Sequence, residues 1–239
     1  RVRALEALSA LGRYEEVYAR IERYAEQDDT NIRMAAFSAF IAEKLKKPTA
    51  HKFCPAPLSF FYSSSIAQHT TNADGFIAAL VDELEKIETI WEPPRKSTTN
   101  GFQLPGSMNL FEQPRGKIAE LETIISKELD NYFSEFKDDA CSLISRWPAQ
   151  KKLHGWHVVL QCQGYQSAHI HPGGWLSGVI YLKVVPTLGK DEGAIEFSLN
   201  GESYSDSSSP FFTYSPSAGD IVLFPSSLHH RPLPFPPAA

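Results

Sequence analysis

The last third of the chain consists of short β-forming segments with no helical segment between them. From residue 153 onward, runs rich in Val, Ile, Phe and Tyr alternate with clusters of Gly, Pro, Asp and Ser. Strands that follow one another without crossover helices cannot form βαβ units, so they must pair mainly antiparallel. This pattern predicts an antiparallel sandwich or barrel of the jelly-roll type.

Two amphipathic helices are predicted upstream of these strands, over residues 77–91 and 117–133. Each places apolar side chains on one helical face, and we expect both helices to cover one face of the sheet. The segment between them, residues 97–111, is polar and contains Gly, which predicts a loop or a short edge strand. The apolar faces comprise Ile77, Leu80, Val81, Leu84, Ile87 and Trp91 in the first helix, and Ile118, Leu121, Ile125, Leu129 and Tyr132 in the second.

Residues 1–46 are almost free of Gly and Pro and predict three short helices. We expect Gly12 to end the first helix, and Asp29 or Thr30 to cap the third. The spacing of residues 12–24 resembles the second helix of a tetratricopeptide repeat. The fit is partial, and an unrelated helical hairpin is the alternative. Because a single repeat cannot bury its apolar face, it implies further repeats or docking on the next domain.

The predicted fold class is therefore α+β, with two parts. A helical, tetratricopeptide-like segment spans residues 1–47, and a jelly-roll domain spans residues 48–239. Within that domain, helical support is expected over 74–136 and the β core over 153–235. A serine-rich stretch, residues 202–210, is expected to be a mobile loop.

The composition narrows the range of partners. A net charge of −5 and a pI near 5.9 argue against a nucleic-acid or anionic-membrane surface. No apolar run approaches the roughly 20 residues of a membrane span. The three scattered cysteines predict buried free thiols in a cytoplasmic protein. The chain starts at Arg1 without Met, so we expect it to be part of a longer polypeptide.

Two histidines one residue apart, His169 and His171, precede a Pro-Gly-Gly turn. On a strand their side chains share one face, with Cα atoms roughly 6.5–7 Å apart, so both can reach one metal ion. A lone pair of this kind can equally be two surface histidines. A candidate third ligand appears in the segment 219–235, which holds His229 and His230, because a jelly roll brings distant strands together. Such ligands bind as neutral imidazoles, so metal occupancy is expected to fall below about pH 6.

The two histidine segments also carry a family resemblance. "HIHPGGWLSGVIYL" (169–182) and "GDIVLFPSSLHH" (219–230) resemble the paired motifs of a family of 2-oxoglutarate/Fe(II)-dependent oxygenases, whose members are sometimes fused to tetratricopeptide repeats. The resemblance implies His169, His171 and His230 as the catalytic metal ligands, with His229 at a variable position. It also implies Fe(II) and 2-oxoglutarate as cofactors, and hydroxylation of an unidentified small-molecule, peptide or protein substrate.

One departure from the wider superfamily keeps alternatives open. His171 stands where most relatives have Asp or Glu, so three neutral ligands would leave Fe(II) with its full charge. A dianionic co-substrate could compensate that charge. A three-histidine dioxygenase that does not use 2-oxoglutarate stays possible. So does a non-enzymatic helical-repeat binding module with a degenerate or structural metal site, which would recruit a protein partner through the N-terminal helices.

The group that would bind the far carboxylate of 2-oxoglutarate is harder to find. In the superfamily a basic residue on the strand after the last histidine commonly holds it, but the prolines after His230 disfavour such a strand. Lys183 is the candidate here, on the same strand face as Tyr181, with Gln161 as a further hydrogen-bonding group. The alternatives are that Lys183 reaches water, or that an arginine beyond residue 239 has this role. His51 and His69 are expected in solvated loops.

Overall fold

The computed structural model describes residues 2–185, 189 and 191–235. The helices are α1 (Val2–Ala10), α2 (Tyr14–Ala25), α3 (Ile32–Leu45), α4 (Ala73–Leu84), α5 (Gly116–Phe136) and α6 (Ser142–Ser145), with short 3₁₀ turns at Pro57–Phe60 and Ile66–Gln68. The strands are β1 (Tyr62–Ser65), β2 (Ile90–Trp91), β3 (Thr98–Gln103), β4 (Val158–Gln166), β5 (Leu176–Ile180), β6 (Ile195–Ser198), β7 (Phe211–Tyr214), β8 (Asp220–Pro225) and β9 (His229–Pro232).

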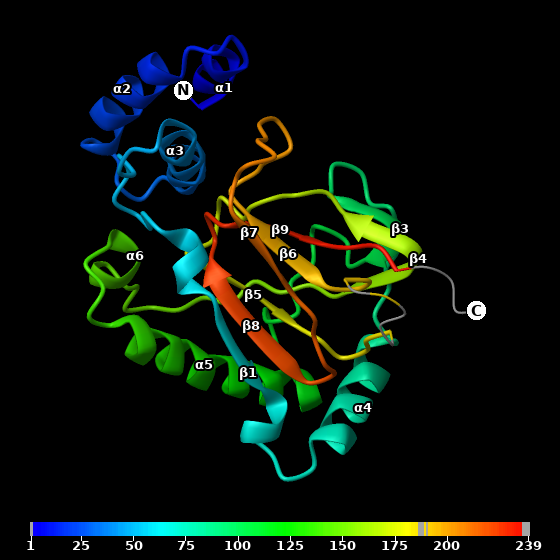
Figure 1. The fold of residues 1–239 in the computed structure, drawn as a ribbon. Helices are drawn as coiled ribbons and strands as arrows, with labels where there is room; N and C mark the ends of the chain where they lie inside the picture. Colours follow the sequence, from blue (N-terminus) through cyan, green and yellow to red (C-terminus); the bar gives the residue numbers. More distant parts are fainter. Residues whose placement is uncertain (1, 186–188, 190, 236–239) are drawn as a thin grey trace.

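The strands form three antiparallel sheets of three strands each, as expected for segments without crossover helices. We call them sheet A (β1-β8-β5), sheet B (β2-β3-β4) and sheet C (β7-β6-β9). Sheets A and C face each other across a shared hydrophobic cluster, and the long helix α5 lies on the other side of sheet A (Figure 1). The prediction of an antiparallel jelly-roll type of fold is confirmed.

Strand β8 shows why this layering follows from the sequence. Its side chains alternate between two apolar layers, so both faces of the strand are buried. Val222 and Phe224 belong to the cluster between sheets A and C. Ile221 and Leu223 belong to the cluster beneath sheet A, which also includes residues of α4, α5 and α6.

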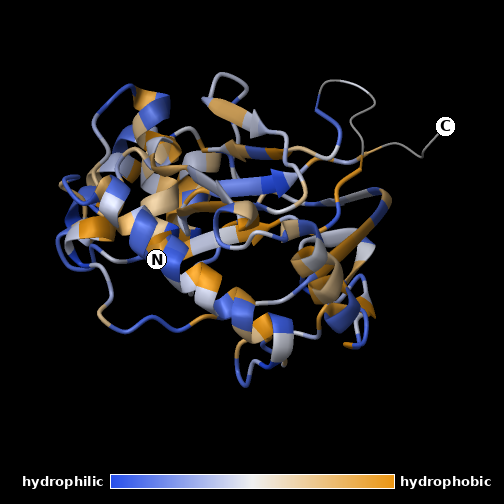
Figure 2. Ribbon diagram, turned by 90° about the horizontal axis from the view of Figure 1, so that it is seen from below, coloured by the Kyte–Doolittle hydropathy of each residue, from blue (hydrophilic) through white to orange (hydrophobic). Residues whose placement is uncertain are grey.

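The helical cover of sheet A agrees with the sequence pattern, with two corrections to element boundaries. Seen from below, the helices of this layer are banded by hydrophobic and hydrophilic residues (Figure 2). The first helix ends at Leu84, and Ile90–Trp91 forms β2 with exposed side chains, so Trp91 is not part of the helix. Residues 98–103 form the middle strand of sheet B rather than a loop or an edge strand, since β3 pairs with both β2 and β4.

Three N-terminal helices form as predicted, and Gly12 ends the first with a φ of +73°. The expected cap of the third helix was wrong: Asn31 is the N-cap, and its side chain accepts a hydrogen bond from the Met34 amide at 3.0 Å. The division at residue 47 and the repeat resemblance stay predictions. The hydrophobic cluster of these helices also includes Leu199 and Tyr204, which follow β6 in the jelly roll.

Two further expectations concern the burial of the cysteine thiols and the presence of membrane-spanning segments. Cys54 and Cys141 are free and buried, but Cys162 is exposed on β4, so the expectation of three buried thiols was wrong for that residue. Within the described ranges, no helix combines the length and apolar character that crossing a membrane requires.

Candidate metal centre

Backbone pairing between two segments that are distant in the sequence brings His169 and His230 together. His169 and His230 form an isolated antiparallel bridge, in which each amide donates to the other residue's carbonyl, at 3.2 and 3.1 Å. Residues directly opposite in such a bridge project their side chains to the same side. The imidazole ring centroids of this pair lie 4.4 Å apart.

The turn after His171 brings in the third histidine. The Gly174 amide donates to the His171 carbonyl at 2.9 Å, which closes the predicted Pro-Gly-Gly turn, and the His171 amide donates to the Ser226 carbonyl at 3.2 Å. Gly174 is required there, since a Cβ atom would lie 2.8 Å from the Ser226 hydroxyl. The segments on both sides of the site are therefore held together by backbone hydrogen bonds.

The three histidines form one group with metal-binding geometry. The ring of His171 lies 5.1 Å from that of His169 and 5.0 Å from that of His230. One ligand nitrogen from each residue lies within 4.8 Å of the others. Imidazole nitrogens bind divalent metals at roughly 2.0–2.1 Å, so an ion shared by this group would lie between the three rings. Imidazole donors suit iron, zinc, copper and nickel.

Hydrogen bonds to backbone carbonyls orient two of the three rings. His169 Nδ1 lies 2.7 Å from the Ser167 carbonyl, and His230 Nδ1 lies 3.2 Å from the Leu228 carbonyl. A carbonyl can only accept, so Nδ1 carries the proton and Nε2 keeps its lone pair. Ligand histidines are usually oriented by this kind of contact. The donor set and the fixed tautomers fit a divalent metal.

Burial keeps these imidazoles neutral. Desolvation lowers the pKa of His169, and it lowers the pKa of His171 to about 4, with smaller contributions from His169 and Lys96. The pKa of His230 is lowered well below its ordinary value, first by burial and then by the two other histidines. Neutral rings are the form that binds metal, so the site should resist protonation to a lower pH than free histidine would.

Aromatic side chains border the cluster, and one of them was not singled out from the sequence. Phe224 of β8 lies 4.6 Å from the ring of His230, and Trp156 lies 5.3 Å from the ring of His171. Trp156 is 36% exposed, so it contacts both His171 and solvent. The sequence pattern did not identify it as a neighbour of the histidines.

The three residues expected to contact 2-oxoglutarate lie in different environments. Tyr181 is in the cluster between sheets A and C, which also holds Phe197 and Phe224 beside the His230 ring. Gln161 is exposed, in an irregular part of β4 opposite β3. Lys183 is 72% exposed, and its Nζ contacts the carboxylate of Glu85 at 2.8 Å, so it is paired here with a surface glutamate.

Two other histidines, His51 and His69, were expected in solvated loops, and the structure corrects both expectations. His51 is fully buried, and its ring contacts the Asp28 carbonyl and the Phe53 amide. His69 contacts the buried carboxylate of Glu128. Neither is a solvated loop histidine. His229 points away from the three-histidine cluster and is buried, with its Nε2 3.3 Å from the Tyr204 hydroxyl.

Comparison with known proteins adds two findings. Residues 154–238, which include all three histidines, match the family model described as "Putative 2OG-Fe(II) oxygenase". The chain also resembles the crystal structure of a Pseudomonas putida prolyl-4-hydroxylase, with a TM-score of 0.50 and 13% sequence identity over 84% of this chain and 91% of that one. A search of curated proteins found no match. The family model matches the part of the chain that holds the three histidines, and the structural likeness shows a shared fold.

Proposed function

We propose that the chain is an Fe(II)- and 2-oxoglutarate-dependent dioxygenase that hydroxylates a small-molecule or peptide substrate. The observation that carries the proposal is the convergence of His169, His171 and His230, inside the segment that matches the oxygenase family model. Two of these rings have the tautomer that leaves Nε2 free for a metal. Lone pairs that converge in this way can be shared by one metal ion.

In such an enzyme the bound iron and 2-oxoglutarate supply oxygen activation, with conversion of 2-oxoglutarate to succinate and CO2. The protein's own residues hold and orient these groups. The three imidazoles would hold the metal as protein ligands and would leave room for co-substrate and oxygen. Trp156 and Phe224 limit the access of water beside His171 and His230. Exclusion of water protects a reactive site from side reactions.

The charge of the site favours an anionic co-substrate. Three neutral ligands do not reduce the +2 charge of a bound metal, so a dianion such as 2-oxoglutarate would be attracted strongly. Lys96 adds positive charge nearby, since it contributes to the low pKa of His171. The Ser167 amide donates to the Ser97 carbonyl at 3.1 Å, which places Lys96 alongside the strand that leads to His169.

Lys96 is therefore our candidate for an anion-binding group in place of Lys183. It forms no ion pair with any of the described residues, whereas Lys183 is paired with Glu85. A lysine without a carboxylate partner can bind a carboxylate ligand. The two lysines thus form a matched pair for testing 2-oxoglutarate binding.

A metal and oxygen assay separates this function from its alternatives. The protein loaded with Fe(II) should consume oxygen and form succinate only when 2-oxoglutarate is present, and the His171→Ala variant should do neither. Oxygen uptake that is independent of 2-oxoglutarate would indicate a three-histidine dioxygenase of another kind. Stable metal binding with no oxygen uptake under either condition would favour the structural metal site of a binding module.

A further inference from the structure

The loop between β6 and β7 was expected to be mobile, but its tyrosine is packed against the N-terminal helices. The ring of Tyr204 lies 4.8 Å from Phe37 and 4.8 Å from Phe40, both on α3. These residues belong to the hydrophobic cluster of the helical segment. The aromatic contacts anchor the loop on α3 and provide the docking that an isolated helical hairpin lacks.

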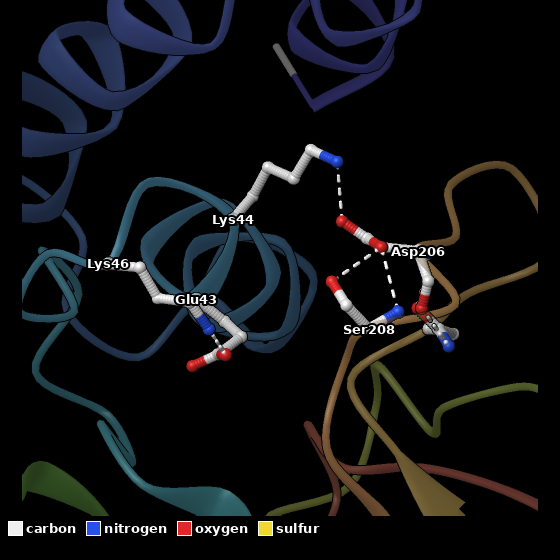
Figure 3. Close-up of polar contacts among 6 residues, drawn as sticks. Glu43, Lys44, Lys46, Asp206 and Ser208 are labelled. Carbon is white, nitrogen blue, oxygen red and sulfur yellow. Dashed lines mark hydrogen bonds and ion pairs between the residues drawn. The ribbon is translucent and has the colours of Figure 1, made fainter.

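An ion pair fixes the same loop a second time. Lys44, also on α3, pairs with the Asp206 carboxylate, which in addition accepts hydrogen bonds from the Ser208 amide and hydroxyl at 2.9 and 2.8 Å (Figure 3). The Asn200 side chain binds the Asp206 backbone from across the loop, at 2.9 and 3.2 Å. The loop is therefore held both internally and to α3.

From this anchored position Tyr204 reaches the start of β9. Its hydroxyl lies 3.3 Å from His229 Nε2, and the two rings are nearly perpendicular, with centroids 5.5 Å apart. His229 is only 5% exposed. At Gly201 a Cβ atom would lie 2.8 Å from His229 Nε2 and 2.9 Å from the Tyr204 ring, so only glycine permits this approach.

The contact bears on the candidate metal centre because His229 and His230 are neighbours on one short strand. Their side chains point to opposite faces, so a restraint on one fixes the orientation of the other. Strand β9 pairs with β6 on one side, where Ser198 lies opposite His229. On its other side, the backbone pairing seen among the described residues is the single bridge to His169. The Tyr204 contact adds a side-chain restraint at His229, where the strand begins.

We propose that Tyr204 and His229 are a positioning pair that sets the place of the His230 ligand, and that the N-terminal helices thereby form part of the metal-binding unit. The inference rests on the proposed role of His230. It departs from the expectation that residues 1–46 serve only to recruit partners. Tyr204 touches no reacting group itself and acts through His229.

The test is a titration of the metal-free protein with Co(II), followed by its visible absorption spectrum, which reports the ligand geometry. The Tyr204→Phe variant keeps the packed ring and loses only the hydroxyl. We expect Co(II) affinity to fall about threefold to tenfold, the range for loss of one hydrogen bond, with a shifted absorption band. Tyr18→Phe is the matched control, since the Tyr18 hydroxyl binds the Pro48 carbonyl at 2.8 Å on the same helical segment. It should leave affinity and spectrum unchanged.

A double-mutant cycle distinguishes positioning from general destabilisation. Once His229→Ala has removed the partner of the Tyr204 hydroxyl, adding Tyr204→Phe should have no further effect on Co(II) affinity, and His229→Gln should restore part of it. Equal affinities and spectra for Tyr204→Phe, Tyr18→Phe and the unaltered chain would contradict the positioning role of Tyr204 and His229. The proposed metal site would be unaffected by that result. Absence of Co(II) binding by the unaltered chain would overturn the metal site, and this inference with it.

Discussion

Two buried clusters of polar side chains, on opposite sides of sheet A, use histidine in different ways. Beneath the sheet, Glu128 of α5 accepts hydrogen bonds from Tyr62 at 2.8 Å, from Ser64 at 2.9 Å, and from His69. On the other side, the Nδ1 atoms of His169 and His230 are bound to carbonyls. No described residue bonds the Nε2 atoms of the three clustered histidines.

The difference shows how to separate a structural cluster from a ligand-binding one. In the Glu128 cluster donors and acceptors match, so the group stabilises the packing of α5 on β1 without any added ligand. In the three-histidine cluster ring nitrogens converge with no donor among the described residues, which is an arrangement that suits a bound cation. Burial alone does not distinguish the two, since both clusters include fully or nearly fully buried residues.

The largest expected effect is the loss of metal from the His230→Ala variant. Removal of outer-shell partners commonly weakens metal binding tenfold to a hundredfold, so loss of a ligand should cost more than about a hundredfold. His69→Ala makes the same change in the Glu128 cluster and should keep full metal content. Metal analysis after dialysis measures both. If His69→Ala loses metal and His230→Ala retains it, the two clusters have been assigned the wrong way round.

The second largest effect is expected in the Glu128 cluster, where a substitution should reduce stability and leave metal binding unchanged. Glu128→Ala leaves the donors of Tyr62, Ser64 and His69 buried without their acceptor, and should lower the free energy of unfolding by about 2–3 kcal/mol. Glu120→Ala on the same helix removes only an exposed ion pair with Lys117. It should change the free energy of unfolding by less than about 1 kcal/mol. Urea unfolding measures both. The remaining folded Glu128→Ala protein should bind Co(II) with unaltered affinity.

The two clusters should also lose stability in different pH ranges. Burial lowers the pKa of His171 to about 4 and lowers that of His169 and His230, so below about pH 6.5 the unfolded chain binds more protons than the folded one. Stability of the metal-free protein should therefore fall from about pH 6.5 downward. His171→Gln should flatten that fall by up to about 1–2 kcal/mol at pH 5.

The Glu128 cluster should respond only at lower pH. Burial alone would raise the pKa of Glu128, but hydrogen bonds from Tyr62, His69 and Ser64 outweigh it and lower the pKa below its ordinary value. Its stabilisation is present above about pH 4.5 and is lost as the pH falls further. Urea unfolding at pH 7.5, 5.5 and 3.5 resolves the two ranges. A metal-free protein equally stable at pH 7.5 and 5.5 would show that the histidines are not buried as neutral rings.

The smallest effects concern the lysines near and far from the site. Lys96→Ala should weaken 2-oxoglutarate binding to the Co(II) protein about threefold to tenfold, as expected for loss of one charge-assisted contact. Lys183→Ala removes an exposed ion pair with Glu85 and should change the affinity for 2-oxoglutarate by less than about twofold. Calorimetric titration gives both affinities. A larger loss in Lys183→Ala would restore the anchor role expected from the sequence.

The sequence predicted what depends on local pattern. The continuous apolar run at 221–224 is typical of a strand buried on both faces, and the i, i+2 spacing of His169 and His171 predicted that their side chains lie together. The environment of His69 could not be predicted, because its partner Glu128 lies 59 positions away on a helix whose register no local pattern defines. Tyr204 was missed for the same reason: a serine-rich stretch predicts mobility, and only the folded chain brings Phe37 and Phe40 beside it.

The anchoring of the β6–β7 loop on α3 has a consequence for the newly made chain. Lys44 and Asp206 are 162 positions apart, and at 5–20 residues per second a ribosome needs roughly 8–30 s to cover that interval. During this time Phe37 and Phe40 lack their aromatic partner, so the nascent helices present an apolar surface to chaperones or to other chains. The proposed ligand set is completed only when His230 emerges, so metal should be acquired only after that residue has been synthesised.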